Sequence, residues 1–281
     1  MSSSGAVAGL GLATAATWGG SDFVGGMGAR RAPAMLVVVS GHVVSLLILL
    51  TICASLRLAL PATHSLAYAA LGGFEGSLAL AVFYRALSMG AMGLTAAVTG
   101  LLTALLPVLF SLFHDGTPSP TAAAGLVTGL AAIWLITQTA GSGEARAPRT
   151  ALVLGALAGI GFGTQLILFK MANEGGVLWT MTAARFAGAL AMIVMLIVRP
   201  PKGRWKGFWL TGVTAGMLDT LGNLLYIRAT QLGRIDAAAL VSSLYPAGTI
   251  LLAAIVLHER PTGKQLAGIG MALAAVVLLS V

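Results

Sequence analysis

The segment Arg85-Ala-Leu-Ser-Met-Gly90 recurs 143 positions later as Arg228-Ala-Thr-Gln-Leu-Gly233. Each copy ends a long apolar stretch, and the offset is close to half of the 281 residues. A repeated segment at this spacing predicts a duplicated chain whose halves share one fold.

Apolar stretches fill almost the whole sequence. The chain is 58% hydrophobic and 9% charged, whereas soluble proteins are roughly half apolar and about a quarter charged. An α-helix needs about 20 residues to cross a hydrocarbon core of about 30 Å. We therefore predict an all-α polytopic membrane protein with ten transmembrane helices. They are placed at 5–27, 33–56, 65–87, 92–113, 121–139, 150–171, 177–198, 206–229, 235–257 and 263–281.

One polar segment interrupts these stretches near the middle of the chain. The segment 141–150 is rich in Gly, Pro and charged residues, which is typical of a linker. We divide the chain into a first five-helix repeat at 1–140, a linker at 141–149 and a second five-helix repeat at 150–281. Because each repeat has an odd number of helices, the second enters the membrane inverted. Two inverted repeats around a central cavity are typical of transporters that work by alternating access.

The basic residues concentrate in alternate loops. Net charge is +8, and we interpret it as topology anchoring rather than nucleic-acid binding. The even-numbered connections hold four basic residues, Arg57, Lys170, Arg228 and Arg234. The odd-numbered connections hold eleven: Arg30, Arg31, Arg85, Arg146, Arg149, Arg199, Lys202, Arg204, Lys206, Arg260 and Lys264. This excess predicts cytoplasmic odd loops and both termini outside.

Small residues and prolines suggest hinges. Gly20 matches Gly163 at the offset of 143, while Pro107 and Pro246 lie 139 apart inside predicted helices. Proline removes a backbone hydrogen bond, which is tolerated where neighbouring helices or a watery cavity satisfy the freed carbonyl. We name these four residues as hinge candidates; packing kinks and close helix packing explain them as well.

Few ionisable side chains fall at membrane depth, where each is costly unless it faces protein or water. Glu75 and Asp219 lie near the middles of the third and eighth stretches, one residue away from repeat equivalence. We expect these two to form a pair of buried carboxylates that holds a substrate ammonium or exchanges a proton. A buried ion pair with Arg185 or Lys170 is the alternative.

Polar and aromatic side chains at similar depth predict the rest of a pocket, which would suit small zwitterionic metabolites. Asp22 and Gln165 occupy equivalent positions in the first and sixth stretches. Trp179, Trp205 and Trp209 fit an interfacial belt better. The predicted substrate-binding residues are Trp18, Asp22, Glu75, Tyr84, Thr99, Thr103, Gln165, Asp219, Asn223, Tyr226, Ser242 and Tyr245.

Motifs of enzymes are missing from the sequence. It has no Gly-Lys-Ser/Thr phosphate loop, no His-Glu-x-x-His and no Gly-x-Ser-x-Gly elbow. The four histidines do not cluster, and a single cysteine excludes an intramolecular disulfide. We expect no enzyme activity, no catalytic residue, no cofactor and no metal. The expected partners are a small-molecule substrate, the lipid bilayer and, as a candidate coupling ion, the proton. We expect no nucleic acid, and a monomer or weak homodimer.

The duplicated five-helix halves resemble the drug/metabolite transporter superfamily, in particular its ten-helix EamA-type exporters. The resemblance is carried by the two repeated segments and by Leu257-His-Glu-Arg-Pro-Thr-Gly-Lys-Gln-Leu-Ala-Gly268, which is similar to the family's Gly-Glu-x-x-x-x-x-Gln-x-x-Gly link. His258 stands where the family usually has Gly. The first half has a weaker copy at 114–121, with Asp115 in place of Glu.

This resemblance implies a basket of helices one, three, four, six, eight and nine around a central cavity, with helices five and ten at the periphery. It also implies export of amino acids or related metabolites by a secondary transporter in a bacterial-type inner membrane. The aromatic and broad-range amino-acid exporters are the implied subgroup. A multidrug or other metabolite carrier and a non-transporting membrane subunit are the alternatives. Family members commonly have cytoplasmic termini, which conflicts with the charge count.

Overall fold

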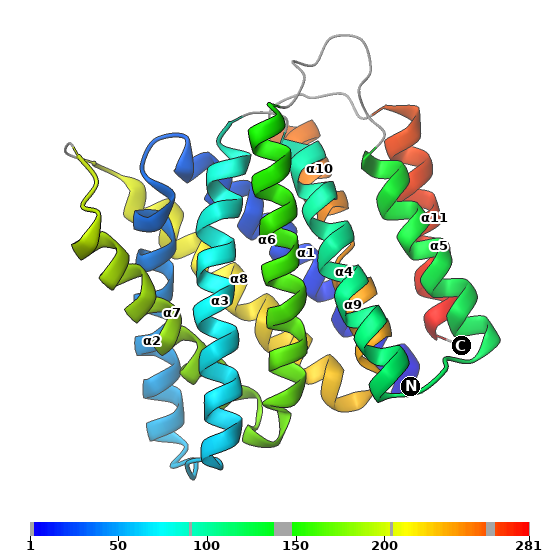
Figure 1. Cartoon of the computed structure of the whole chain (residues 1–281), viewed down its shortest axis with the longest axis horizontal. Helices are drawn as coiled ribbons and strands as arrows, with labels where there is room; N and C mark the ends of the chain where they lie inside the picture. The colour runs from blue at the N-terminus through cyan, green and yellow to red at the C-terminus, as the bar shows by residue number, and fades with distance from the viewer. Residues whose placement is uncertain (1–2, 90–91, 138–147, 203–204, 257–261, 281) are drawn as a thin grey trace.

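A computed structural model describes residues 3–89, 92–137, 148–202, 205–256 and 262–280 (Figure 1). These residues form helices and no strand, which confirms the all-α prediction for the described part of the chain. The α-helices are α1 (Ser3–Ala29), α2 (Ala34–Ser55), α3 (Thr63–Leu87), α4 (Met92–His114), α5 (Pro120–Thr137), α6 (Arg149–Met171), α7 (Val177–Val198), α8 (Phe208–Leu232), α9 (Ile235–Ser242), α10 (Tyr245–Val256) and α11 (Gly263–Ser280). A short 3₁₀ turn, η1 (Asn173–Gly175), precedes α7.

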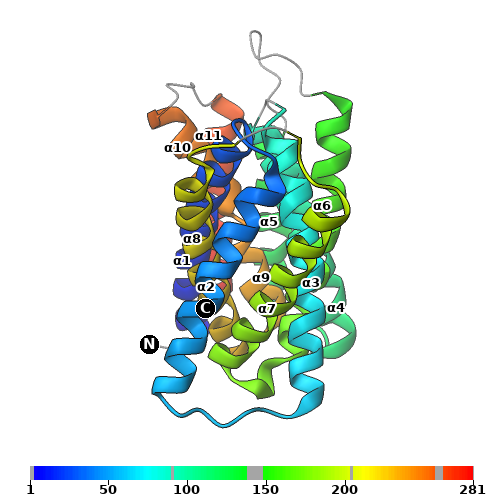
Figure 2. The same cartoon turned by 90° about the vertical axis from the view of Figure 1, so that its left-hand side faces the viewer.

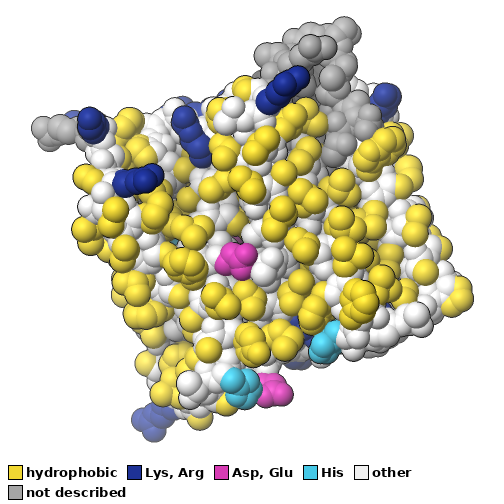
Figure 3. Space-filling model, viewed as in Figure 1, with side chains coloured by type: hydrophobic (Ala, Val, Ile, Leu, Met, Phe, Trp, Pro, Cys, Tyr) yellow, Lys and Arg dark blue, Asp and Glu magenta, His cyan; other side chains and the backbone are white. Residues whose placement is uncertain are grey.

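Within the described residues, five helices are long and apolar enough to cross a membrane: α2, α3, α4 from Leu94, α6 and α7. The apolar segments in α5 and α11 are shorter. Helices α1 and α8 have 27 and 25 residues but are not among the five. Apolar side chains dominate the outer face in Figure 3. The chain is therefore a multi-pass membrane protein.

The predicted ninth helix at 235–257 is broken into two. Helix α9 ends at Ser242 and α10 begins at Tyr245, with Pro246 in the first turn of α10. The first turn tolerates proline because its amides have no partner within the helix. A broken helix at membrane depth is tolerated where protein or a cavity satisfies the freed backbone groups. In contrast, Pro107 lies inside α4, which runs continuously through it.

The helices of the two predicted repeats pack reciprocally. Helix α1 packs most extensively against α8, and α3, the counterpart of α8, packs most extensively against α6, the counterpart of α1. Helices α2 and α7 lie together on one side of the molecule, and α5 packs against α11 on the opposite side (Figures 1 and 2). This arrangement places the fifth and last helices at the periphery, as the resemblance implied.

Two repeat-equivalent contacts have the closest backbone approach. On α2 and α8, a Cβ atom at Gly41 or Gly216 would collide with the backbone of the other. On α3 and α7, a Cβ atom at Gly73 would collide with the backbone of Ala184. Gly41 and Ala184 are 143 positions apart, as are Gly73 and Gly216. Small residues let helices approach closely where lipid removes the hydrophobic drive to associate.

The two ends of the helix bundle differ in charge. Lys and Arg side chains gather along the upper edge in Figure 3, the end that carries the odd-numbered loops. Helix α1 begins and α11 ends at the opposite end (Figure 1). Most of the linker, together with Arg146, Arg204, Arg260 and His258, lies outside the described residues.

Candidate substrate-binding cavity

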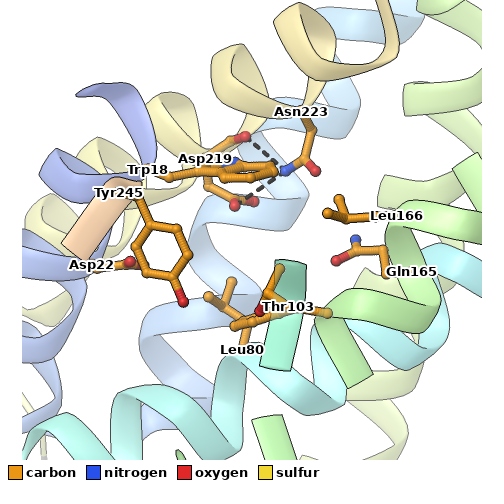
Figure 4. A pocket seen from close by; sticks show the side chains of 10 residues that line it. Trp18, Asp22, Leu80, Thr103, Gln165, Leu166, Asp219, Asn223 and Tyr245 are labelled. Atoms are coloured by element: carbon orange, nitrogen blue, oxygen red, sulfur yellow. Dashed lines mark hydrogen bonds between the residues drawn. The ribbon is translucent and has the colours of Figure 1, made fainter. Parts of the chain in front are cut away.

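A small cavity lies among helices α1, α3, α4, α6, α8 and α10 (Figure 4). These are the six helices that the resemblance placed around a central site, since α10 is the second part of the ninth stretch. The lining residues are Trp18, Asp22, Leu80, Thr103, Phe162, Gln165, Leu166, Asp219, Asn223 and Tyr245.

The cavity is narrow in this conformation. Water-sized molecules can occupy about 30 Å³ of it, which is room for about one or two waters. Pockets for drug-sized ligands usually measure roughly 300–1,000 Å³. A metabolite would therefore bind here only after the surrounding helices move apart.

Asp219 has its own counter-ion. Its carboxylate forms an ion pair with Arg185 of α7, which is 3% exposed. Asn223, one turn further along α8, donates a hydrogen bond to Asp219 Oδ1 at 3.1 Å and to its carbonyl at 2.8 Å (Figure 4). This ion pair agrees with the alternative reading of the sequence. Lys170, the other basic candidate, instead donates to the Thr230 carbonyl at 3.1 Å.

The ion pair belongs to a buried polar cluster. Arg185 donates to Thr220 Oγ1 at 3.0 Å, and Thr220 donates to Ser45 Oγ at 2.8 Å. An Arg185 guanidinium nitrogen also lies 3.1 Å from His42 Nε2. Since His42 and Arg185 are 143 positions apart, this contact joins two positions that the predicted repeat makes equivalent. The cluster holds the Asp219 carboxylate in one orientation at the cavity wall.

Asp22 lies in a different environment from Asp219. It is 6% exposed, and its carboxylate makes no hydrogen bond with any described residue. Its repeat equivalent, Gln165, lines the same cavity from α6. Asp22 and Asp219 bring two carboxylates to the cavity, and Arg185 neutralises one of them.

Several further predicted residues surround this site. Thr103, Asn223 and Tyr245 line the cavity, and the Trp18 ring lies 6.2 Å from Tyr245 in an edge-on arrangement. Tyr226 lies behind Trp18, with ring centroids 6.0 Å apart, and donates to a backbone carbonyl.

Like Tyr226, three more predicted residues lie near the cavity without lining it. The buried Tyr84 hydroxyl is 3.0 Å from Ser21 Oγ. Thr99 joins α4 to α6 by donating to the Gly155 carbonyl at 2.8 Å. Ser242 is fully buried at the end of α9, and its hydroxyl has no hydrogen-bond partner in the described residues. None of these three residues lines the cavity in this conformation, and their role in substrate binding stays a prediction.

Glu75 does not join the cavity, which differs from the predicted pairing with Asp219. It is partly exposed on α3 and is not among the lining residues. The true repeat equivalent of Asp219 is Gly76, where a Cβ atom would collide with Gln165. Because a helix turns about 100° per residue, the offset of one position points Glu75 away from the site.

Sequence reasoning missed the apolar lining residues Leu80, Phe162 and Leu166. Apolar side chains in a membrane helix carry no signal that separates a cavity wall from a lipid-facing surface. The repeat could have identified Leu80, because it is the equivalent of Asn223.

The hinge candidates lie in different settings. Gly20 lies inside α1, and Gly163 packs inside α6 against Leu106. Pro107 is buried within α4, whereas Pro246 follows the break between α9 and α10. Their hinge role stays a prediction.

A second polar cluster lies at the end of the bundle at which α1 begins. Arg234, between α8 and α9, donates to Asp236 Oδ2 at 2.8 Å and to the Gly116 carbonyl at 2.8 Å. It also donates to the Asp115 carbonyl at 3.0 Å and to Ser111 Oγ at 3.2 Å. Arg234 thereby ties the start of α9 to the end of α4.

The cluster is electrostatically stabilised. Hydrogen bonding to Asp236 raises the pKa of Arg234 against the opposing effect of burial. Burial by itself raises the pKa of Asp115, but hydrogen bonds from His114 and Ser111 and the charge of Lys170 outweigh it, so this pKa lies below its ordinary value. Asp115 and Arg234 are therefore both charged at neutral pH.

Residues 149–281 match the EamA-like transporter family. The matched EamA-like domain covers a little under half of the chain. This domain begins at the first residue of α6 and extends to the end of the chain. The family belongs to the drug/metabolite transporter superfamily, which supports a membrane transporter with a small-molecule substrate.

Two further similarities concern length and fold. An uncharacterized protein of Methanocaldococcus jannaschii is 24% identical over 139 residues, which are 47% of this chain and 97% of the relative. The relative is thus about as long as one predicted repeat. A crystal structure of a protein with 17% sequence identity has a TM-score of 0.76 and covers 98% of both chains. The two proteins therefore share a fold over 98% of this chain.

Proposed function

We propose that this protein is a secondary transporter that exports amino acids or related small metabolites by alternating access. The observation that carries the proposal is the contrast between the two cavity carboxylates. Asp219 has Arg185 as its counter-ion, whereas the Asp22 carboxylate has no hydrogen-bond partner among the described residues. A buried carboxylate is costly unless it is paired. The ammonium group of a substrate would supply the missing partner of Asp22.

Other cavity groups fit the remainder of an amino acid. The buried Trp18 Nε1 and Asn223 Oδ1 have no hydrogen-bond partner in the described residues. They offer one donor for a carboxylate and one further acceptor for an ammonium. Leu80, Phe162 and Leu166 provide apolar wall for a side chain. The lining thus combines few polar groups with a larger apolar surface, as in other small-molecule sites.

Alternating access follows from the proposed organisation as two inverted five-helix repeats, 1–140 and 150–281, joined by a linker at 141–149. Reciprocal packing of α1 with α8 and of α3 with α6 supports this division, as do the domain match at 149–281 and the half-length relative. Exchanging the conformations of two such repeats opens one central site to either side.

The proposed location is a bacterial-type inner membrane, with the basic end in the cytoplasm and both termini outside. The excess of Lys and Arg at the odd-numbered loops supports this orientation. A cysteine introduced at Ser4 should then react with a membrane-impermeant thiol reagent in intact cells. Labelling only after lysis would show the opposite orientation, with the termini in the cytoplasm.

Transport in reconstituted liposomes tests the proposal. Purified protein should take up radiolabelled amino acids, and Asp22→Asn should reduce uptake at least about tenfold because the ammonium loses its charged partner. Glu75→Gln is the matched control, since it removes the same charge from a carboxyl outside the cavity. Equal activity of Asp22→Asn and wild type would reject the proposed role of Asp22.

Proton coupling through Asp22 and Asp219 is part of the proposal. If either carboxylate releases a proton when the substrate binds, an imposed pH gradient should stimulate uptake by the wild type. The same gradient should not change uptake by the double variant Asp22→Asn/Asp219→Asn. Unchanged uptake by the variant with Asp22, Asp219 and Glu75 all converted to amides, across the pH range, would eliminate coupling through these residues. Uptake without any gradient indicates a facilitator.

A multidrug carrier is the second candidate, favoured by the aromatic rings of Trp18, Tyr226 and Tyr245 beside an unneutralised carboxylate. Cations bind well to aromatic faces. The same liposomes, tested with quaternary ammonium dyes, separate the two functions. No flux of any solute would instead favour a structural membrane subunit.

A further inference from the structure

A hollow at the basic end of the molecule is separate from the central cavity. It holds about 540 Å³ of space for water-sized molecules, compared with about 30 Å³ in the cavity. The two share no lining residue. The hollow is lined by the turn between α1 and α2, by α3, α6 and α7, and by Trp205: Ala29, Arg30, Arg31, Ala32, Pro33, Ala34, Met35, Ala81, Val82, Arg85, Leu154, Met195 and Trp205.

Three arginines give this hollow its charge. Arg30 and Arg31 are exposed in the turn after α1, and Arg85 is exposed near the end of α3. Among the described residues, none of the three forms an ion pair or a hydrogen bond through its side chain. The described acids lie elsewhere, in the cavity, at the middle of α3 and in the segments at the opposite end: Asp22, Glu75, Asp115, Glu174, Asp219 and Asp236.

The rest of the lining is apolar. Val82, Leu154 and Met195 come from three different helices, and Trp205 is 39% exposed. Trp side chains favour the membrane–water interface, where one part of the ring is apolar and the indole N–H reaches polar groups. The hollow therefore presents charge toward the basic end and an apolar wall toward the helices.

We propose that this hollow binds an anionic phospholipid, with the headgroup phosphate on Arg30, Arg31 and Arg85 and an acyl chain along the apolar wall. Guanidinium groups bind phosphate oxygens in a bidentate manner. Basic pockets between helices on the cytoplasmic side of a membrane bind anionic headgroups. Topology anchoring explains basic residues at this end, but it does not require them to surround a hollow.

Native mass spectrometry of the detergent-purified full chain, titrated with phosphatidylglycerol, tests the site. The triple variant Arg30→Gln/Arg31→Gln/Arg85→Gln should bind at least tenfold more weakly than wild type. The control Arg199→Gln/Lys202→Gln/Lys206→Gln removes three positive charges from the same end without touching the hollow. Equal weakening in both variants would overturn the proposal, because it would show a diffuse charge effect.

Two ligand arms identify the source of the phosphate. Phosphatidylcholine should bind more weakly than phosphatidylglycerol, because its headgroup has no net charge. Inorganic phosphate at millimolar concentration should not displace the bound phosphatidylglycerol. Full displacement by phosphate would indicate a free-anion site and would overturn the assignment to a lipid.

A measurement on the unaltered hollow covers the case in which the triple variant does not fold. The fluorescence of Trp205 is obtained as the difference between wild type and Trp205→Phe. In nanodiscs, brominated phosphatidylglycerol should quench this fluorescence more strongly than brominated phosphatidylcholine at the same mole fraction. Equal quenching by both lipids would overturn the proposal.

Discussion

The two ends of the molecule have opposite chemistry. At the basic end, exposed arginines surround a hollow and have no acidic partner in the described residues. At the other end, Arg234 is bound to Asp236, Ser111 and two backbone carbonyls, so that α4 and α9 are tied together. In the described residues, one end is rich in unpaired arginines, and at the other end an ion pair and hydrogen bonds hold the helices together.

This difference shows where the proposed internal symmetry stops. At the offset of 143, Arg234 corresponds to Ala91 and Asp236 corresponds to Gly93, so the sequence cannot form the same ion pair at the basic end. The central contacts remain equivalent, because the approach of Gly41 to Gly216 matches that of Ala184 to Gly73. The middle of the membrane needs close packing in both halves, whereas each end faces a different solution.

The largest expected effect tests the symmetric middle. Gly73→Leu and Gly216→Leu should each destabilise the protein by about 3 kcal/mol, because the new side chain collides with the backbone of a neighbouring helix. Thermal unfolding in detergent measures both. Gly9→Leu is the control, since a Cβ atom there meets nothing within 4 Å. A cost at only one of the two sites would break the equivalence of the halves.

The next effect tests the cross-linked end. Arg234→Ala leaves Asp236, whose side chain is 3% exposed, without its counter-ion. Losing charged hydrogen bonds costs about 2 kcal/mol, so opening at this end should become at least about tenfold more frequent. Reaction of Thr103→Cys with a thiol reagent, in a Cys53→Ala background, reports the opening.

Arg228→Ala is the matched control for this measurement. Its side chain is exposed near the same end and has one hydrogen bond, to Gln231. If both arginine variants expose the cavity equally, the Arg234 cluster does not hold this end closed.

The smallest effect refines the role of Asp115. The folded protein lowers the pKa of this carboxyl below its ordinary value of 3.8. The ionised carboxylate therefore stabilises the fold at pH values above 3.8, and this stabilisation is lost as pH falls through the lowered pKa. Asp115→Asn should cost less than about 1 kcal/mol at pH 7, because the group is partly exposed. Unfolding measured from pH 7 to pH 3 should show the difference between variant and wild type shrinking. A constant difference would assign the effect to packing.

The positions of the helices could be predicted well from hydropathy, because a segment of about 20 apolar residues in a chain this apolar has few alternatives to a membrane helix. The break between α9 and α10 could not. Pro246 and Pro107 both lie inside apolar stretches, and only the surrounding packing separates a continuous helix from a broken one. A close approach of α1, where a Cβ atom at Gly19 would collide with the Tyr245 carbonyl, occurs at the break.

Some cavity residues could likewise be predicted from the sequence, and others could not. Asp22, Gln165 and Asp219 could be named because polar side chains at membrane depth are rare. The predicted pairing of Glu75 with Asp219 is not seen in the cavity, because the offset of one residue rotates Glu75 by about 100° about the helix axis. Apolar lining residues such as Phe162 carried no signal.

The sequence by itself determined the membrane class, the approximate helix positions and the rare polar groups that a site must use, because lipid restricts a chain to apolar helices and penalises each buried charge. The tertiary structure alone decided which carboxylate is neutralised, since Arg185 comes from another helix to pair with Asp219 and leaves Asp22 without a partner among the described residues. Counter-ions act over a few ångströms. The order of the residues does not show which side chains from distant parts of the chain come that close.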